Sequence, residues 1–168
     1  MPRHLTVPDP ALVVLVGVAG SGKSTFAGRV FAPTQVLSTD AFRAMVADDP
    51  ADQSATRAAF ELLHRLAALR LARGRLTVVD ATNTLPDARA DLVELAGAHG
   101  VPAVAIVLDV PPRVCAARRP ALPVGAVRQQ RARLRTALRE LTGEGFAAVH
   151  VLSGPDEVAT ATVEAVRS

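Results

Sequence analysis

The sequence predicts an α/β fold in which an open parallel sheet carries helices on both faces. Short apolar runs of strand length recur along the chain, and segments with helical periodicity lie between them. Strands that alternate with helices in this way form parallel sheets covered on both sides. A glycine-rich segment, GVAGSGKSTF (17–26), separates the first apolar run from the first helical pattern. In this fold class, a glycine-rich turn between a strand and a helix is typical of a phosphate-binding site.

Five apolar runs are predicted to be the strands of the sheet. Each is a nearly continuous stretch of Val, Leu, Ile and Ala, which is typical of a parallel strand buried on both faces. We expect strands at residues 11–16, 35–38, 76–80, 103–109 and 147–152.

Helical patterns fill the intervals between these runs. The clearest lies between Ser54 and Arg73, where Ala58, Leu62, Leu66 and Leu69 recur at three- to four-residue spacing, and Gly74 follows as a stop signal. The predicted helices cover residues 23–31, 40–47, 54–73, 86–99, 126–142 and 155–166. No repeat, linker or low-complexity tract divides the chain, so residues 1–168 are predicted to form a single domain.

Composition supports one globular domain and sets its surroundings. The chain has 168 residues, of which 49% are hydrophobic and 21% charged, and its net charge of +3 does not by itself imply nucleic acid. Cys115 is the only cysteine, so no internal disulfide can form, and a reducing cytoplasm is the expected location. No apolar run reaches the roughly 18 residues of a membrane span, so we expect no membrane association.

The glycine-rich segment completes the G-x-x-x-x-G-K-[ST] pattern of a phosphate loop. Its backbone N–H groups and the positive end of the following helix are predicted to bind the phosphates of ATP or another NTP. Lys23 is expected to bridge the β- and γ-phosphates, and the Ser24 hydroxyl to ligate Mg²⁺. The residues predicted to bind the nucleotide are Gly17, Gly20, Ser21, Gly22, Lys23, Ser24 and Thr25.

Lys23 is also the only lysine among 19 Lys and Arg residues. A compact ammonium on a flexible stem fits inside a tight loop, whereas a planar guanidinium is bulky and fork-shaped. This difference explains why one lysine is retained at this position. Other nucleotide-binding classes are not supported, because the chain has no N-K-x-D motif of GTPases and LSGPD (152–156) lacks the double glycine of the ABC signature.

Two further segments place polar residues at the carboxyl edge of the sheet, where such folds bind ligands. STDAFR (38–43) follows the second strand, so Asp40 could accept a proton from an acceptor hydroxyl, with Arg43 one turn along on the same helix face. The alternative is that Asp40 caps the helix. VVDATN (78–83) ends the third strand with Asp80, Thr82 and Asn83, and the alternative for Asn83 is an Asx-type turn.

Together these segments resemble the polynucleotide 5′-kinases, most closely the kinase module of bacterial RNA-repair polynucleotide kinase-phosphatases. The resemblance covers nearly the whole chain. The order of phosphate loop, S-x-D-x-x-R and V-D-A-T-N is its most specific part. The matching segments are GSGKSTFA, LSTDAFRAMVADDPADQ, AFELLHRLAALRLARGRLTVVDATN, VPAVAIVLDVP and VRQQRARLRTALRELTGEGF.

The resemblance implies a P-loop NTPase fold of the adenylate kinase type and assigns roles to individual residues. Asp40 would be the general base on a 5′-hydroxyl, and Arg43 would hold a phosphate of the acceptor strand. Thr82 and Asn83 would line the acceptor channel, while Asp80 would stand near the water shell of the metal. Arg118 would be a catalytic lid arginine that contacts the transferring phosphates. Family members often carry phosphatase and ligase modules after the kinase, so the chain could be one module of a larger protein.

The lid, expected at about residues 113–126, departs from the family pattern. After CAARR (115–119) the family usually has a longer segment with several arginines, whereas PALPVGA (120–126) is short and uncharged. Arg118 can be matched to the family with more support than Arg119, and a further lid arginine has no match. Either lid closure is less extensive here, or another residue such as Arg128 substitutes.

A basic helix is predicted after the lid. Eight arginines and no acidic residue lie between Arg113 and Arg139. Helical spacing places four of them in one stripe, opposite an apolar face of Val127, Leu134, Leu138 and Leu141. The stripe is either a track for a phosphodiester backbone or a solvated helix face. Its four members are Arg128, Arg131, Arg135 and Arg139.

Three functions fit the sequence. The leading interpretation is a kinase that transfers the γ-phosphate of an NTP to a 5′-hydroxyl end of RNA or DNA. The second is a kinase for a small metabolite or nucleotide-sugar, and the third is a nucleotide-gated binding module that transfers no phosphate. The sequence leaves open the choice between RNA and DNA, the preferred NTP and the oligomeric state.

Overall fold

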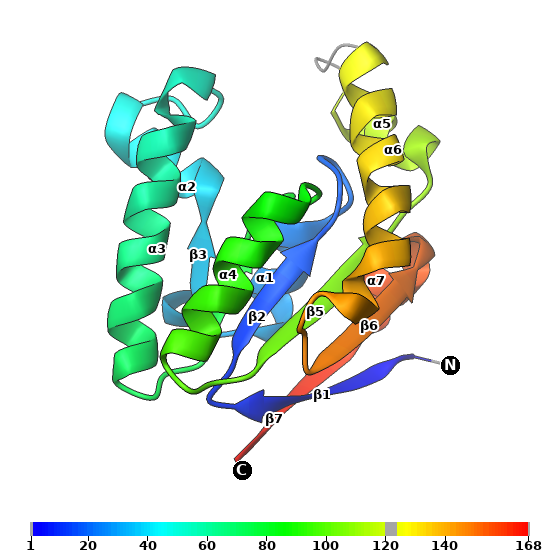
Figure 1. Ribbon diagram of the computed structural model, residues 1–168. Helices are drawn as coiled ribbons and strands as arrows, with labels where there is room; N and C mark the ends of the chain where they lie inside the picture. The colour runs from blue at the N-terminus through cyan, green and yellow to red at the C-terminus, as the bar shows by residue number, and fades with distance from the viewer. Residues whose placement is uncertain (1, 120–123, 168) are drawn as a thin grey trace.

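The computed structural model describes residues 2–119 and 124–167, and a five-stranded parallel sheet lies at its centre (Figure 1). The strand order is β3-β4-β2-β5-β6. This arrangement confirms the predicted fold class, and the observed strands differ from the predicted runs by only one or two residues. The strands are β2 (Leu12–Val16), β3 (Val36–Ser38), β4 (Thr77–Asp80), β5 (Ala103–Asp109) and β6 (Ala148–Ser153).

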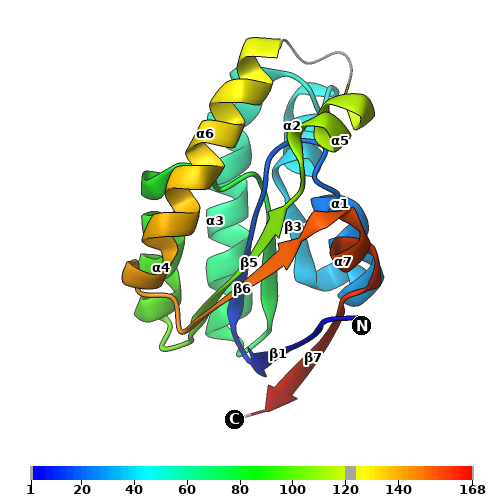
Figure 2. The same cartoon turned by 90° about the vertical axis from the view of Figure 1, so that its right-hand side faces the viewer.

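Helices cover both faces of the sheet. Figure 2 shows α3, α4 and α6 on one side of the sheet and α1 and α7 on the other. The α-helices are α1 (Lys23–Val30), α2 (Thr39–Ala47), α3 (Thr56–Ala72), α4 (Pro86–Ala98), α5 (Pro112–Arg118), α6 (Val124–Glu140) and α7 (Gly154–Thr160). Short 3₁₀ turns lie at η1 (Pro33–Gln35), η2 (Gln53–Ala55) and η3 (Leu141–Gly143). Helix α5 was not predicted, because its seven residues are too few to show a helical period.

The core lies between the sheet and these two helical layers. All five residues of β2 and nearly all of β5 are buried, as expected for central parallel strands. On α3 the buried face differs from the predicted apolar pattern. The exposed fractions of Leu62, Leu66 and Leu69 are 43%, 38% and 48%. Instead, small residues and two other leucines pack inward at the same spacing: Ala59, Leu63, Ala67 and Leu71.

The predicted helix at 155–166 is wrong in its second half. Helix α7 ends at Thr160, and residues Thr162–Arg167 form strand β7, which pairs in parallel with β1 (His4–Asp9) in a separate two-stranded sheet. The segment is rich in Thr and Val, whose branched side chains favour a strand. Its partner strand lies at the other end of the sequence, so no local pattern could have indicated the pairing.

The predicted lid is only partly described. Helix α5 and the beginning of α6 fall within residues 113–126, but residues 120–123 of the uncharged segment lie outside the described residues. In the part of the chain that the structure describes, no helix is both long and apolar enough to cross a membrane.

Candidate active site

The predicted site residues come from three adjacent strands that end at the same edge of the sheet. Strands β3, β4 and β2 are neighbours and run in parallel, so the segments that follow them lie side by side. The phosphate loop follows β2, Asp40 lies in the first turn of α2 after β3, and Asp80 is the last residue of β4. The topology therefore brings together the three segments that the sequence singled out.

The phosphate loop takes a conformation that its glycines permit. Gly20 and Gly22 have φ angles of 84° and 94°, in the left-handed region that disfavours side chains. A Cβ at Gly20 would lie 2.5 Å from the carbonyl oxygen of Cys115 on α5, so the loop packs directly against this helix. Helix α1 begins at Lys23, with no side-chain cap and no acidic residue in its first turn. Its first N–H groups are therefore available to an anion.

Lys23 points back into the loop that precedes it. Its Nζ donates to the Val18 carbonyl oxygen at 3.1 Å. Burial lowers the pKa of Lys23, while the negative charges of Asp80 and Asp40 oppose that effect. The ammonium is thus held in the cradle where the β- and γ-phosphates are predicted to bind.

Ser24 and Asp80 form an oxygen pair suited to a hard divalent cation. The Ser24 hydroxyl donates to Asp80 Oδ2 at 2.7 Å, and Asp80 is only 5% exposed. Burial raises the pKa of Asp80. No group of three or more His, Cys, Asp or Glu residues among those described could form a metal site without help. Mg²⁺ commonly takes one or two protein oxygens together with substrate phosphates and water, so the adjacent Ser24 hydroxyl and Asp80 carboxylate fit this metal.

Asp40 is free of the capping role that was its alternative. Ser38 is the N-cap of α2, and its Oγ accepts a hydrogen bond from the backbone N–H of Ala41 at 3.3 Å. The Asp40 carboxylate instead forms an ion pair with Arg43 and is half exposed. Asp40 lies in the first turn of α2, directly after β3, and β3 is the neighbour of β4, so the carboxylate is at the same edge of the sheet as Asp80.

Arg43 is anchored within its own segment. Its Nε donates to the Pro50 carbonyl oxygen at 2.9 Å, and its side chain is 13% exposed. The loop after α2 therefore holds the guanidinium in place beside Asp40. A contact between Arg43 and an acceptor phosphate stays a prediction.

The V-D-A-T-N segment forms hydrogen bonds to β2 and to the start of the phosphate loop. The Thr82 carbonyl oxygen accepts from the Gly17 N–H at 3.0 Å. Asn83 has a φ of 50°, is 3% exposed, and donates through Nδ2 to the Leu15 carbonyl oxygen at 2.8 Å. Because this amide points inward, the geometry favours a structural role for Asn83 in the turn. Lining of the acceptor channel by Thr82 and Asn83 stays a prediction.

Two side chains from α5 and α6 contact the phosphate loop. Arg118 Nη1 donates to the Gly20 carbonyl oxygen at 3.1 Å, which places this predicted lid arginine at the loop. Gln130 Oε1 accepts from the Ala19 N–H at 2.9 Å. Sequence reasoning did not find Gln130, because the two residues are 111 positions apart and no motif links them.

The four arginines of the predicted stripe on α6 lie in two different environments. Arg131 Nη1 forms an ion pair with Asp109 Oδ1 at 2.7 Å, at the end of β5, so this arginine fixes the helix to the sheet. It lies at the edge of the buried face of α6 rather than opposite it, as its neighbour Leu134 is fully buried. Arg128, Arg135 and Arg139 are exposed, so three arginines of the stripe face solvent.

The sequence also did not predict a buried ion pair. Arg89 on α4 has an exposed fraction of 0% and binds Glu144 through two hydrogen bonds of 2.7 and 2.8 Å. Its Nη1 donates to the Asn83 carbonyl oxygen at 3.2 Å. Arg89 therefore connects the segment after α6 to the turn that supports the phosphate loop.

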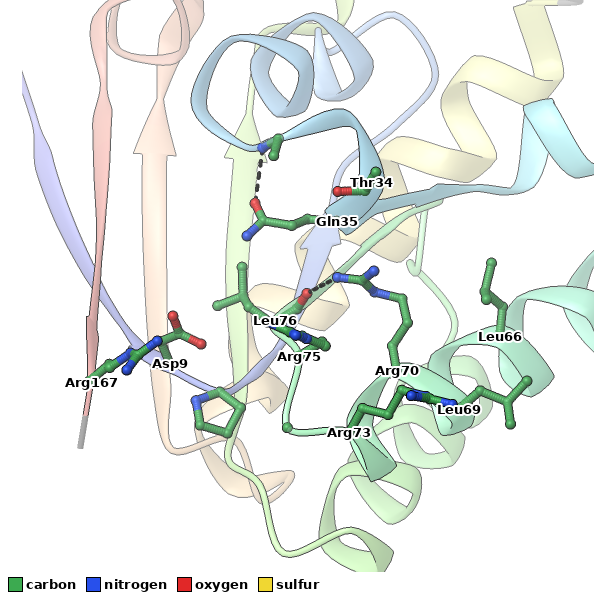
Figure 3. Close-up of a pocket in the computed structure, with 13 residues that line it drawn as sticks. Asp9, Thr34, Gln35, Leu66, Leu69, Arg70, Arg73, Arg75, Leu76 and Arg167 are labelled. Atoms are coloured by element: carbon green, nitrogen blue, oxygen red, sulfur yellow. Dashed lines mark hydrogen bonds between the residues drawn. The ribbon is translucent and has the colours of Figure 1, made fainter.

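A cavity lies at the opposite edge of the sheet. It has a volume of about 750 Å³ and is bordered by the segments that precede β2, β3 and β4, together with the end of α3 (Figure 3). Four arginines and Asp9 surround it, but it contains none of the predicted site residues. The four arginines are Arg70, Arg73, Arg75 and Arg167.

Comparison with known proteins supports this picture of the fold. A family model described as an AAA domain matches residues 12–141. A comparison with curated proteins finds no match. Among solved structures, a proposed kinase from Chloroflexus aurantiacus J-10-fl has a TM-score of 0.64 at 18% identity, over 88% of this chain and 86% of that chain.

Two further structures have the same fold with different stated contexts. A chain of the Pnkp1/Rnl/Hen1 RNA repair complex has a TM-score of 0.68 at 23% identity, over 80% of this chain and 47% of that chain. A gluconokinase from Sinorhizobium meliloti 1021 has a TM-score of 0.57 at 21% identity, over 91% of this chain and 87% of that chain. The fold is therefore that of P-loop kinases, and these structures leave the acceptor open.

Proposed function

The chain belongs to the AAA domain family AAA_33, and from this premise we propose that it is a kinase that transfers the γ-phosphate of ATP or another NTP to a 5′-hydroxyl end of RNA or DNA. The observation that carries the proposal is the position of Asp40. Its carboxylate is not used as a helix cap, is paired with Arg43, and lies at the same edge of the sheet as the phosphate loop and Asp80. A carboxylate beside a phosphate cradle is suited to take the proton from an attacking hydroxyl.

Each of the other site residues has a part in the proposed reaction. The loop amides and Lys23 hold the β- and γ-phosphates and stabilise the charge that spreads over them during transfer. Ser24 and Asp80 would hold Mg²⁺, which when bound would neutralise negative charge on the triphosphate. Arg118 moves from the Gly20 carbonyl oxygen to the transferring phosphate. Asp40 removes the proton as the 5′-oxygen forms its bond to phosphorus and the bond to the leaving diphosphate breaks.

Two observations favour a polynucleotide acceptor. The exposed arginines of α6 present fixed positive charge on a helix whose Gln130 contacts the phosphate loop, as a track for a phosphodiester backbone requires. The order of phosphate loop, S-x-D-x-x-R and V-D-A-T-N also resembles polynucleotide 5′-kinases, and one similar structure comes from an RNA repair complex.

A metabolite kinase is the second candidate, since a gluconokinase shares the fold. The test is incubation of the chain with γ-labelled ATP, Mg²⁺ and one acceptor at a time. The acceptors are a 5′-hydroxyl RNA, a 5′-hydroxyl DNA, the same strands with a 5′-phosphate, and a panel of hydroxylated metabolites. We expect label only on the 5′-hydroxyl strands. Label on a metabolite with unlabelled strands would assign the second candidate, and label on no acceptor would indicate a binding module.

A further inference from the structure

One peptide group of the phosphate loop is held from both sides. The Val18 carbonyl oxygen accepts from Lys23 Nζ at 3.1 Å, and the N–H of the next residue, Ala19, donates to Gln130 Oε1 at 2.9 Å. These two atoms belong to the same peptide group. Because a trans peptide is planar, its C=O and N–H point in opposite directions, so a bond that fixes the N–H also fixes the C=O. Lys23 and Gln130 are therefore linked through a single rigid group.

Within the loop, few contacts determine the orientation of this peptide. The Val18 carbonyl oxygen also accepts from the Ser21 N–H at 3.1 Å, which closes the turn from inside. Among the described residues, Gln130 is the hydrogen-bond partner of the Ala19 N–H. The following residue, Gly20, has a φ of 84°, and its carbonyl oxygen accepts from Arg118 Nη1. Gln130 therefore supplies the contact from outside the loop that fixes the N–H end of this peptide.

Gln130 approaches from a firmly placed part of α6. The adjacent Arg131 is bonded to Asp109 at the end of β5, and Leu134 one turn later is fully buried. The contact therefore transmits the position of the helix and sheet to the loop. Arg118 adds a second contact from the lid, at the Gly20 carbonyl oxygen.

We propose that Gln130 is a positioning residue for Lys23, which sets the place of the ammonium through the Val18–Ala19 peptide and so couples helix α6 to phosphoryl transfer. The rate part of this proposal rests on the proposed kinase function, whereas the positioning part does not. The carboxamide acts as a hydrogen-bond acceptor, and this chemistry determines which substitutions retain the effect.

The experiment compares three variants of the full chain. Gln130→Met keeps the size of the side chain and removes the acceptor, and Gln130→Glu keeps an acceptor oxygen. Gln129→Met makes the same chemical change at an exposed position one residue earlier and serves as the control. Two readouts require no turnover: hydrogen exchange of the Ala19 amide, and the NMR signal of the lysine side chain, which isotope-labelled lysine gives for one residue only.

For Gln130→Met we expect Ala19 exchange at least tenfold faster, a displaced or broadened Lys23 signal, and kcat lower by roughly ten- to a hundredfold, the range expected for displaced catalytic groups. Gln130→Glu is expected to keep the wild-type exchange rate and kcat. Its KM for ATP should be higher, because the carboxylate charge repels the triphosphate. Gln129→Met should match the wild type.

Two results would overturn the proposal. One is an unchanged Ala19 exchange rate and Lys23 signal in Gln130→Met. The other is a loss of kcat that Gln130→Glu does not restore. If the wild-type chain phosphorylates no acceptor, the kinase proposal fails, and the exchange and lysine signals still decide whether Gln130 positions Lys23.

Discussion

At the residue scale, Lys23 shows why a chain that is otherwise rich in arginine keeps one lysine. Its ammonium lies inside the loop, 3.1 Å from a carbonyl oxygen that also accepts from a loop amide. The wider, planar guanidinium cannot take this place without moving the loop. We therefore predict that Lys23→Arg abolishes phosphoryl transfer and leaves thermal unfolding nearly unchanged. Transfer of labelled phosphate within a few-fold of the wild-type rate would contradict this explanation.

Asp40 allows a second test at the same scale. Asp40→Asn keeps the shape of the side chain but cannot accept the proton, so we predict that turnover falls by roughly 10² to 10⁴. ATP affinity should change little, because the loop amides and Lys23 bind the phosphates. Asp91→Asn, at an exposed position on α4, is the control. Tenfold weaker ATP binding with little loss of rate would instead make Asp40 a structural residue.

Burial of the Asp80 carboxylate lowers the stability of the folded protein, and its proposed role in binding Mg²⁺ explains why it lies there. Burial raises the pKa of this carboxyl, so the folded state binds its proton more tightly than the unfolded state does. Stability should therefore fall as the pH rises above the ordinary value of 3.8, and the ionised carboxylate then destabilises the nucleotide-free protein at neutral pH. We predict that Asp80→Asn raises Tm at pH 7 by a few degrees while Mg²⁺-dependent transfer is lost. The gain in Tm should shrink as the pH is lowered toward 3.8, and a lower Tm at pH 7 would contradict the argument.

The residues of the site differ in how far the sequence could place them. Lys23 and Ser24 lie in a contiguous motif, and the ends of adjacent parallel strands meet at one edge, so Asp40 and Asp80 could be placed near the loop. Gln130 and the Arg89–Glu144 pair could not be predicted, because each contact joins segments that are distant in sequence and depends on how α6 packs on the sheet.

At the element scale, helix α6 combines two functions on neighbouring faces. Arg131 is bonded to Asp109, whereas Arg128, Arg135 and Arg139 are exposed. The spacing correctly predicted the helix and most of its basic stripe. It could not show that one arginine meets a carboxylate at the end of β5, since that depends on tertiary packing.

The exposed arginines give a prediction about the acceptor. The double charge reversal Arg128→Glu and Arg135→Glu should raise the KM for a long 5′-hydroxyl strand and reduce its salt dependence, because fewer condensed counterions are released on binding. Turnover of a nucleoside 3′-phosphate, too small to reach α6, should be unchanged.

The matched control makes the same charge change on α3, at the exposed residues Arg57 and Arg65. Kinetics at several salt concentrations separate the two sites. An equal effect of both double variants would mean that net charge, and not a track on α6, attracts the strand.

Helix α3 shows a limit of apolar periodicity. The leucines at three- to four-residue spacing indicated the helix correctly, yet three of them are substantially exposed. Alanines alternate with leucines on the buried face, because small side chains let α3 approach neighbouring elements closely. Periodicity therefore predicted the element, while packing distance decided which face is buried.

At the scale of the whole molecule, the two ends of the chain are joined by the β1–β7 pair (Figure 1). Strand β1 contributes Leu5 and Val7 to the core, with exposed fractions of 2% and 0%, whereas β7 is mostly exposed. The five-stranded sheet could be predicted from local apolar runs, but this pair could not, because its two strands are separated by almost the full length of the chain.

The β1–β7 pair provides the last prediction, from two adjacent exposed positions on β7. The Thr162 N–H donates to the Arg3 carbonyl oxygen, and successive N–H groups point to opposite sides of a strand. The backbone N–H of Glu164 therefore points toward β1, and the N–H of Ala165 points toward the open edge. Glu164→Pro removes a backbone N–H that donates to β1. Ala165→Pro removes an N–H that faces the open edge of the two-stranded sheet, where proline is tolerated.

We expect Glu164→Pro to lower stability by about 1–3 kcal/mol more than Ala165→Pro does, which for a chain of this size corresponds to a Tm difference of several degrees. The exposed His4–Glu164 pair adds little to that difference, since solvent screens it. ATP affinity should stay the same in both variants, because the phosphate loop lies at the carboxyl end of β2, and β1 leads into the opposite end. Thermal unfolding and nucleotide titration measure the two quantities. Equal Tm values for the two variants would show that β7 does not hold β1 in place, and the stability of β1 would then come from the burial of Leu5 and Val7 alone.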